Sequence, residues 1–322
     1  MAVAFSVSWP PRLSAQTPER TRRIGILMGA AEHDLDWPRL QSALEQELKN
    51  LGWIRGRNLR IDYRWPGDDV GRTNTAAIEL VELGPDVIVT DSASNVQALR
   101  RRTDSIPIIF VNVGDPVGNG VVPNLTRPGG SITGFTTFDS KIGEKWLELV
   151  KEIAPRVSRV ALLFNPDTAL DARNYLSPLE AAAPSTAIKP VSMPFRTATE
   201  LELAIGTFAR APNGALLILP DTSAVLHRRS IIDMANRHRL PAVYPSRFFV
   251  TDGGLVSYGM DTAAECKGAA SYIDRILRGQ SPGDLPVQAP EKFELVVNAK
   301  TAKALGLAVP PSLLARADEV IE

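Results

Sequence analysis

The chain has 322 residues, of which 44% are hydrophobic, and its 36 Lys and Arg balance its 36 Asp and Glu. This length and apolar content predict two domains rather than one. Nucleic-acid-binding proteins usually carry a basic excess, so the formal net charge of zero argues against nucleic acid as a partner. The single cysteine, Cys266, excludes an intramolecular disulfide and a cysteine-based metal site.

The N-terminal segment, residues 1–23, differs in character from the rest of the chain. Its first nine residues, MAVAFSVSW, are apolar, and Leu13–Ser14–Ala15 before Gln16 resembles the cleavage site of a signal peptide. The apolar part is short and no basic residue precedes it, so we expect a signal peptide truncated at its start. This predicts export to the periplasm, with a disordered cytosolic tail as the alternative. No later stretch approaches the roughly 20 apolar residues of a membrane-spanning helix.

The first half of the chain alternates short apolar runs with helical patterns. The runs predicted as strands are residues 23–29, 59–65, 86–94, 106–113 and 131–138. Helical patterns lie between the first four strands, at residues 36–52, 73–83 and 95–102. In the first of these helices Leu40, Leu44 and Leu48 form an apolar stripe. Strands that alternate with helices indicate a parallel sheet covered by helices on both faces.

The same alternation restarts near residue 141 and continues into the tail. Strands are predicted at residues 159–167, 188–195, 214–223 and 241–249, and helices at 141–155, 170–183, 198–211 and 224–239. The tail carries predicted strands at 253–259 and 293–298, a long helix at 262–279 and a turn at 305–314. Two sets of similar size predict an α/β protein of two similar lobes.

Small or polar residues end five of the predicted strands. They are Gly29 and Ala30, Asp91–Ser92–Ala93, Gly114–Asp115–Pro116, Asn165–Pro166–Asp167 and Pro220–Asp221–Thr222. In open parallel sheets a ligand binds outside the carboxyl ends of the strands, where helix N-termini also point their free N–H groups. Capping of helices and turns is the alternative for any single residue of this set. Five such ends in two lobes favour a ligand site.

The sequence offers no convincing catalytic constellation. No Gly-x-Ser-x-Gly elbow occurs, and GDPVGNG at residues 114–120 matches neither a dinucleotide fingerprint nor a phosphate-binding loop. Glu32, His33, Asp34 and Asp36 are a conceivable metal cluster, but they lie in a predicted loop without helical ligand spacing. We therefore predict a protein that is not an enzyme and that uses no cofactor and no metal.

Six segments of the chain resemble one protein family. They are LGWIRGRNLRIDYRW (51–65), IPIIFVNVGDPVGNGVV (106–122), LTRPGGSITGF (125–135), RVALLFNP (159–166), LPAVYPSRFFVTDGGLVSYG (240–259) and the C-terminal stretch 290–322. In this order they closely resemble the ABC transporter substrate-binding protein family that includes the TrpX-like tryptophan-binding proteins. The resemblance runs from about Arg22 to Glu322.

This resemblance implies the type I periplasmic binding protein fold, in which two doubly wound parallel-sheet lobes joined by three crossovers close on a ligand. The crossovers are expected near Phe138, Tyr258 and Leu285. The N-terminal lobe would comprise residues 24–137 plus 258–284, and the C-terminal lobe residues 138–257 plus 285–322. Such proteins deliver a ligand to a membrane permease powered by a separate ATPase. A periplasmic solute-binding protein of an ABC importer is expected, free rather than lipid-anchored because no lipobox cysteine is present. We also expect it to be a monomer.

Family members of known ligand type bind aromatic amino acids, which implies an amino-acid-like ligand here. Its carboxylate is assigned to Ser92 and Ala93, which begin a predicted helix, with help from the loop at Gly29 and Ala30. Its ammonium group is assigned to Asp221, because a charge in a closed cleft needs an anionic partner. Further candidate ligand contacts are Asp115 as the second choice for the ammonium, its neighbour Pro116, Asn165, and the aromatic residues Trp37, Tyr244 and Tyr258.

Two departures from the family pattern leave the ligand open. Asp91–Ser92–Ala93 stands where many relatives have Gly-Thr-Pro, and Asp221–Thr222 stands where relatives often have Asp-Pro. A ligand-binding sensor or an enzyme on the same two-lobed fold is the alternative function, since fold alone does not decide function. The signal-like N-terminus and the missing nucleophile favour transport.

Overall fold

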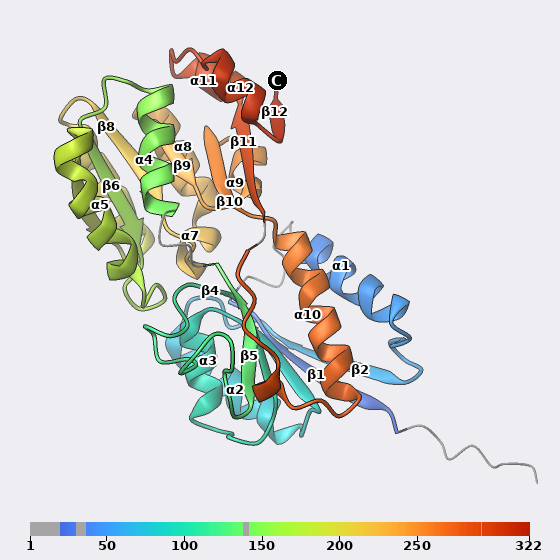
Figure 1. Ribbon diagram of the computed structural model, residues 1–322. Helices are drawn as coiled ribbons and strands as arrows, with labels where there is room; N and C mark the ends of the chain where they lie inside the picture. The colour runs from blue at the N-terminus through green and yellow to red at the C-terminus, as the bar shows by residue number, and fades with distance from the viewer. Residues whose placement is uncertain (1–19, 30–36, 138–141, 291) are drawn as a thin grey trace, which may run out of the picture.

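The computed structural model describes residues 20–29, 37–137, 142–290 and 292–322, which form two lobes, one above the other in Figure 1. Each lobe is built on one sheet. The first sheet has the order β2-β1-β3-β4-β5, and the second has the order β12-β11-β10-β9-β8-β6-β7. In both sheets the chain winds outward in two directions from an inner strand. The predicted fold class, α/β with two doubly wound parallel-sheet lobes, is confirmed.

The first sheet is parallel throughout and is covered on both faces. Its strands are β1 (Arg22–Leu27), β2 (Leu59–Arg64), β3 (Val87–Asp91), β4 (Ile108–Val113) and β5 (Ile132–Thr136). One face packs against α1 (Trp37–Asn50) and α10 (Thr262–Leu277), and the other against α2 (Val70–Glu82) and α3 (Ala93–Arg100). Helices α1 and α10 lie side by side in Figure 1, although they are far apart in the sequence.

The second sheet is parallel except where β10 pairs antiparallel with β11. Its strands are β6 (Arg159–Phe164), β7 (Lys189–Pro194), β8 (Gly214–Ile218), β9 (Ala242–Tyr244), β10 (Val256–Met260), β11 (Phe293–Asn298) and β12 (Glu319–Ile321). Around it lie α4 (Ile142–Ile153), α5 (Ala172–Thr186), α6 (Ala198–Ala209), α7 (Thr222–Leu226), α8 (Arg228–Arg237), α9 (Arg247–Thr251), α11 (Ala299–Ala304) and α12 (Pro311–Arg316).

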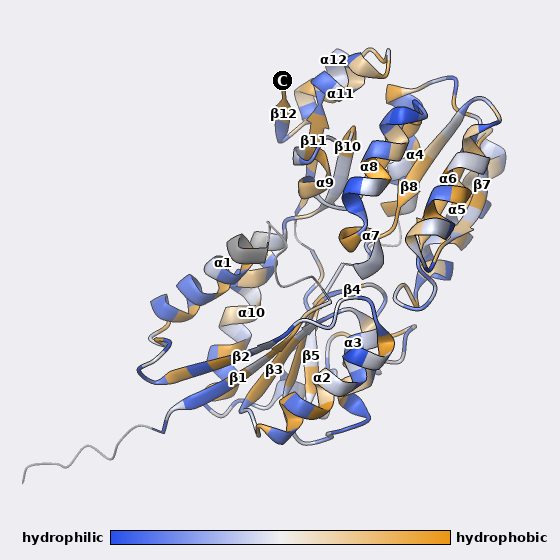
Figure 2. Ribbon diagram, turned by 180° about the vertical axis from the view of Figure 1, so that it is seen from behind, coloured by the Kyte–Doolittle hydropathy of each residue, from blue (hydrophilic) through white to orange (hydrophobic). Residues whose placement is uncertain are grey.

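The cores lie between these helices and the sheets. Strands covered on both faces carry continuous apolar runs, and β8 is an example in which every residue is buried. Figure 2 shows the same arrangement, with hydrophobic strands inside each lobe and hydrophilic colour on the outer sides of the helices. Within the described ranges, no helix combines the length and the hydrophobicity needed to cross a membrane.

The chain crosses from the second lobe to the first directly after β10, and the segment that returns lies along the edge of the first sheet. Strand β10 belongs to the second sheet, and α10, which follows it directly, packs on the first. The return segment then extends the edge of β5, because Thr136 N donates to Gln288 O (2.9 Å) and Gln288 N donates to Gly134 O (3.0 Å). The domain limits given by the sequence stay a prediction.

Local structure departs from the sequence-based expectation in the second lobe. The predicted helix 224–239 begins earlier, at Thr222, because the Asp221 carboxylate accepts from Ser223 N, and it is interrupted at His227. The predicted strand 241–249 ends at Tyr244, before Pro245, which has no N–H to donate, and the chain continues into α9. Residues 311–316 of the expected turn form α12.

The inner strand β8 of the second sheet is expected to contribute strongly to stability. Leu217 in β8 is fully buried, whereas Leu203 in α6 is 68% exposed. Leu217→Ala should lower the free energy of unfolding by about 2–5 kcal/mol through lost burial and a residual cavity. Leu203→Ala should change it by roughly 0.5 kcal/mol or less. Urea denaturation followed by circular dichroism measures both, and equal midpoints for the two variants would contradict this packing.

Candidate functional site

The carboxyl ends of the two sheets meet at a cavity of about 130 Å³. The first lobe contributes Met28, Asp91 and Asn112 from the ends of β1, β3 and β4, and the second contributes residues that follow β8 and end β10, such as Pro220 and Met260. The first turn of α10 and one side of α4 complete the wall. The cavity therefore lies where a ligand is expected in doubly wound sheets.

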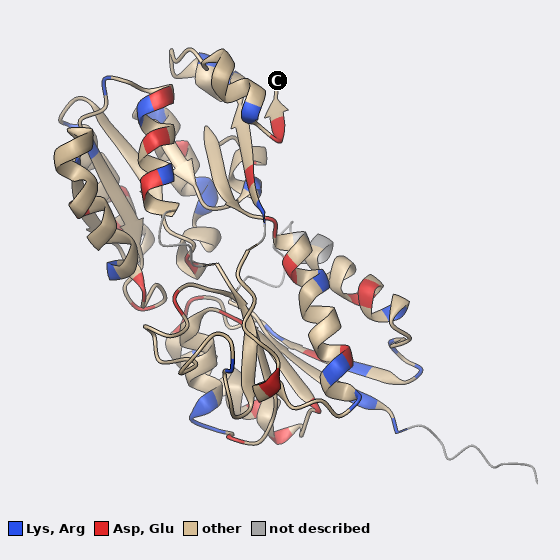
Figure 3. Cartoon of the chain, viewed as in Figure 1, with Lys and Arg blue, Asp and Glu red and all other residues tan. Residues whose placement is uncertain are grey.

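Carboxylates dominate the polar part of this wall. Asp91, Asp221 and Glu265 line the cavity, and no Lys or Arg of the described residues does so. Figure 3 shows acidic segments in red where the two lobes face each other, while most of the Lys and Arg lie on outward surfaces. Charges buried in an apolar site need partners, so the bonds of each carboxylate decide its role.

Asp221 is buried and both of its oxygens are occupied by its own lobe. Oδ2 accepts from Asn165 N (2.8 Å), and Oδ1 accepts from the Thr168 hydroxyl and from Ser223 N (3.3 Å). The predicted contact Asn165 is also buried, and its Nδ2 donates to Ser223 Oγ (2.7 Å). Burial raises the pKa of Asp221 to about 6, although these bonds oppose the shift. Asp221 thus ties together the loops that follow β6 and β8.

Asp91 and Glu265 lie on the first-lobe side of the cavity. Asp91 Oδ1 accepts from Gly29 N (2.9 Å) and from Asn95 Nδ2 (2.8 Å), and burial raises the pKa of Asp91 to about 6. Glu265 Oε1 accepts from Asn112 N at 2.6 Å. Burial, with a smaller contribution from the charge of Asp91, raises the pKa of Glu265 to about 8, although the bond from Asn112 N opposes the shift.

Sequence reasoning did not single out Glu265. A Glu in the first turn of a helix is ordinary, because it suits the helix dipole. The feature that makes Glu265 unusual is tertiary. The register between β4 and β5 shifts between Phe110 and Val113, and Asn112 has a φ of 53°, a conformation that releases its N–H toward Glu265.

Asp115 joins the two lobes. Its Oδ1 accepts from Gly118 N (2.8 Å) within its own turn, and its Oδ2 accepts from Asn174 Nδ2 (2.7 Å) in the opposite lobe. The carbonyl of the predicted contact Pro116 accepts from Val121 N within that turn. Asp115 does not line the 130 Å³ cavity. Its turn-forming role agrees with the alternative drawn from the sequence.

The approach of the lobes beside Asp115 is very close. A Cβ added to Gly114 would lie 1.8 Å from Asp171 Oδ2 and 2.9 Å from the Tyr175 hydroxyl oxygen, both in the second lobe. Burial raises the pKa of Asp171 to about 6, and the charge of Asp115 adds to the shift. Glycine is therefore required at residue 114 for this arrangement of the lobes.

Ser92 and Ala93 are near the cavity but outside its lining. Ser92 has a φ of 59°, a conformation rare for residues with a side chain, and its Oγ accepts from Asn95 N (3.4 Å) as the cap of α3. Ala93 is buried in the first-lobe core. Gly29 packs against Thr222 of the other lobe, where an added Cβ would lie 2.5 Å from Thr222 Cγ2. Ala30 lies outside the described residues.

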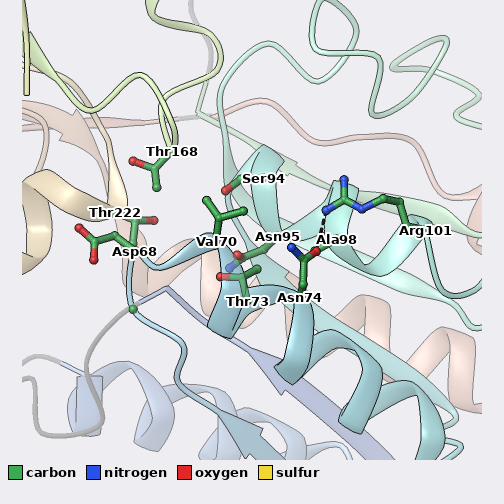
Figure 4. Close-up of a pocket in the computed structure, with 11 residues that line it drawn as sticks. Asp68, Val70, Thr73, Asn74, Ser94, Asn95, Ala98, Arg101, Thr168 and Thr222 are labelled. Carbon is green, nitrogen blue, oxygen red and sulfur yellow. Dashed lines mark hydrogen bonds between the residues drawn. The ribbon is translucent and has the colours of Figure 1, made fainter. Parts of the chain in front are cut away.

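A smaller interlobe cavity of about 30 Å³ lies beside α3 (Figure 4). Ser94 and Asn95 line it from the first lobe, and Thr168 and Thr222 line it from the second. Asp68, labelled in the same view, accepts a hydrogen bond through Oδ2 from Ser223 Oγ at 2.8 Å. The lobes are thus bridged by hydrogen bonds on this side as well as at Asp115.

The aromatic residues of the wall differ from those expected. Tyr244 is fully buried and stacks on Phe249 in the second-lobe core, and Tyr258 stacks on Phe293. Neither lines the cavity. Trp37 begins α1, and its side chain lies outside what the structure describes. The aromatic residues that do line the cavity are Trp146 of α4 and Phe248 of α9.

Metal binding has no support in the part of the chain that the structure describes. No group of three or more His, Cys, Asp or Glu residues is arranged to hold a metal ion there. The segment with Glu32, His33, Asp34 and Asp36 lies outside the described residues.

The protonation of Glu265 predicts a pH-dependent stability. Its pKa is about 8 in the folded protein against a reference of 4.5, so folding retains a proton that the unfolded chain releases between these values. Wild-type stability should therefore lose this contribution as pH rises from 4.5 to 8. Glu265→Gln keeps an acceptor for Asn112 N without a charge, so its melting temperature should exceed that of the wild type increasingly toward pH 8.

The control for this measurement is Glu82→Gln, because Glu82 is exposed at the end of α2. It should leave the melting temperature close to that of the wild type. Differential scanning fluorimetry from pH 5 to pH 9 makes the comparison. A constant difference between Glu265→Gln and the wild type over this range would contradict the buried, protonated Glu265.

Comparisons with known proteins match the chain over nearly its whole length. A family model described as ABC transporter substrate binding protein matches residues 31–321. A tyrosine-binding protein of Clostridioides difficile (strain R20291) is 27% identical over 290 residues, which cover 90% of this chain and 82% of that protein.

Two solved structures share the fold across both lobes. A conserved domain protein from Vibrio cholerae O1 biovar El Tor is 29% identical with a TM-score of 0.85, over 94% of this chain and 100% of that one. An ABC domain from Streptococcus pneumonia in complex with L-Trp has a TM-score of 0.86 at 22% identity, with the same coverage. Because the family model spans both lobes and the cavity between them, the chain belongs to the ABC transporter substrate-binding protein family.

Proposed function

We propose that the protein is the solute-binding component of an ABC importer and that it holds a small amino-acid-like ligand, with an aromatic side chain, in the 130 Å³ interlobe cavity. The observation that carries the proposal is the composition of the wall. It combines carboxylates, with no Lys or Arg of the described residues, and the rings of Trp146 and Phe248. An ammonium group and an aromatic side chain match these two features.

The relatives support the same ligand class. The similar protein from Clostridioides difficile is named for tyrosine, and the similar domain from Streptococcus pneumonia holds L-Trp. The ligand's carboxylate is assigned, as from the sequence, to the start of α3 at Ser92 and Ala93, beside the Gly29 loop. Helix N-termini attract anions, and this property of α3 supports the assignment.

The proposed role in an importer implies a cellular location and a partner for the protein. As in other members of the family, the binding component would work in the periplasm or outside the cell, and it would release its ligand to a membrane permease. No cofactor, metal or nucleic acid enters this proposal, and a monomer suffices for it. A sensor of the same ligand is the alternative, and a permease gene next to this one would separate the two.

A ligand screen tests this function. L-Trp, L-Tyr and L-Phe should raise the melting temperature, because a ligand that binds only the folded state stabilises it by about 2.7 kcal/mol at 100 times its Kd. Neutral sugars such as D-ribose should not. NMR of the recovered ligand should show it unchanged, which separates binding from enzymatic turnover. A screen in which no amino acid stabilises the protein would reject the proposal.

Lobe closure predicts the effect of a single methyl group. Gly114→Ala places a Cβ against Asp171 and Tyr175 of the other lobe, so the bound arrangement should be strained and affinity should fall about tenfold. Gly206→Ala is the matched control, because a Cβ there meets nothing within 4 Å. Calorimetry gives the affinities, and small-angle scattering with saturating ligand should show a less compact Gly114→Ala protein. Equal affinities for the two variants would show that closure does not bring the lobes this near.

A further inference from the structure

Four acidic side chains near the cleft differ in how many of their oxygens are already bonded. Both oxygens of Asp221 and both oxygens of Asp115 accept hydrogen bonds from protein donors. Asp91 and Glu265 each accept bonds from other residues through one oxygen only, and no other residue in the described ranges donates a hydrogen bond to the second oxygen of either. Both residues line the 130 Å³ cavity.

Glu265 is the most isolated of the four. It is 5% exposed, and no Lys or Arg of the described chain forms an ion pair with it. It also lines a neighbouring cavity of about 410 Å³ that contains Lys292. Lys292 is not its counterion, because its Nζ pairs with Asp318 Oδ1 at 2.8 Å and its side chain is 70% exposed. A nearly buried carboxylate oxygen in a ligand cavity thus lacks a donor.

A hydrogen bond from the backbone of β4 holds the Glu265 side chain in position. The shifted register after Phe110 and the positive φ of Asn112 direct one backbone N–H to Oε1. Asp91 is held in the same way by Gly29 N and Asn95 Nδ2. A pair of carboxylates anchored through one oxygen each leaves the other oxygens available to one compact cation with several donors, such as an ammonium group.

We propose that Asp91 and Glu265 together bind the ammonium group of the amino-acid ligand, on the first-lobe side of the cavity. This inference rests on the proposed function and deepens it, and it replaces Asp221 as the first choice for the ammonium. Asp221 instead holds the two loops of the second lobe that contact the ligand from the other side. A ligand without a cationic amine leaves the pair without a partner.

The charges around Glu265 agree with this assignment. Asp91 faces it from β3, and Asp261 and Cys266 are its neighbours at the start of α10. The charge of Glu265 contributes to raising the pKa of Cys266 to about 12, after burial. A group with a pKa of about 8 keeps its proton at pH 7, so an incoming ammonium displaces that proton as it binds.

The first test compares two ligands on matched variants. L-Trp carries the ammonium, and indole-3-propionic acid lacks it while keeping the ring and the carboxylate. Glu265→Gln and Asp91→Asn should each weaken L-Trp binding about tenfold or more, since a charge-assisted hydrogen bond is lost. Their affinity for indole-3-propionic acid should change much less. Glu82→Gln, with the same change in charge at an exposed residue, should bind both ligands like the wild type.

The outcomes separate this inference from the function on which it rests. If the wild-type protein binds no amino acid, the proposed function fails and the inference fails with it. If the wild type binds L-Trp and both Glu265→Gln and Asp91→Asn bind it equally well, the function stands and the inference is overturned. A larger loss in Asp221→Asn, in a variant that melts like the wild type, also overturns it and restores the assignment from the sequence.

A second readout detects the proton directly. Isothermal titration of L-Trp at pH 7 in buffers with different ionisation enthalpies measures the protons released on binding. The wild type should release up to one proton per ligand, and Glu265→Gln should release clearly less. A structural role for Glu265 alone would leave the proton count unchanged, so equal counts in both proteins would refute the ammonium pair.

Discussion

Two parallel sheets face each other through the carboxyl ends of their strands, and the rest of the site depends on how closely these edges approach. Glycine makes the approach possible, because a Cβ at Gly114 or Gly29 would overlap Asp171 or Thr222 of the opposite lobe. Hydrogen bonds from Asn174 to Asp115 and from Ser223 to Asp68 bridge the lobes. The ligand cavity of about 130 Å³ is the space that remains between these contacts.

The same geometry concentrates negative charge. Strand ends supply Asp91, Asp115 and Asp221, and helix starts supply Asp171 and Glu265. Hydrogen bonds from neighbours compensate Asp115 and Asp221, whereas Glu265 has one donor and keeps its proton near neutral pH. A binding protein gains from this arrangement, because a cationic ligand supplies the counterion that lets Glu265 release its proton and ionise beside Asp91. Binding of a cationic ligand and closure of the lobes would then shift the same conformational equilibrium.

The fold and some residues of the site could be predicted from the sequence. Alternating strands and helices, with polar residues at the strand ends, predict the two sheets and place Asp221 at the edge where the structure has it. Strand periodicity cannot tell which aromatic residue faces a cleft, and Tyr244 belongs to the core. Trp146 and Glu265 were missed because they come from helices whose sequences look ordinary, and only the tertiary packing of α4 and α10 brings them to the cavity.

A crystal structure of the protein with L-Trp would show directly whether the acidic interlobe cavity holds the ammonium group of an amino acid. We expect the indole ring beside Trp146 and Phe248, and the ammonium nitrogen within about 3.2 Å of oxygens of both Asp91 and Glu265. The lobes should be bridged by the hydrogen bonds at Asp115 and Asp68. An ammonium bound to Asp221 alone, or a ligand outside this cavity, would contradict it.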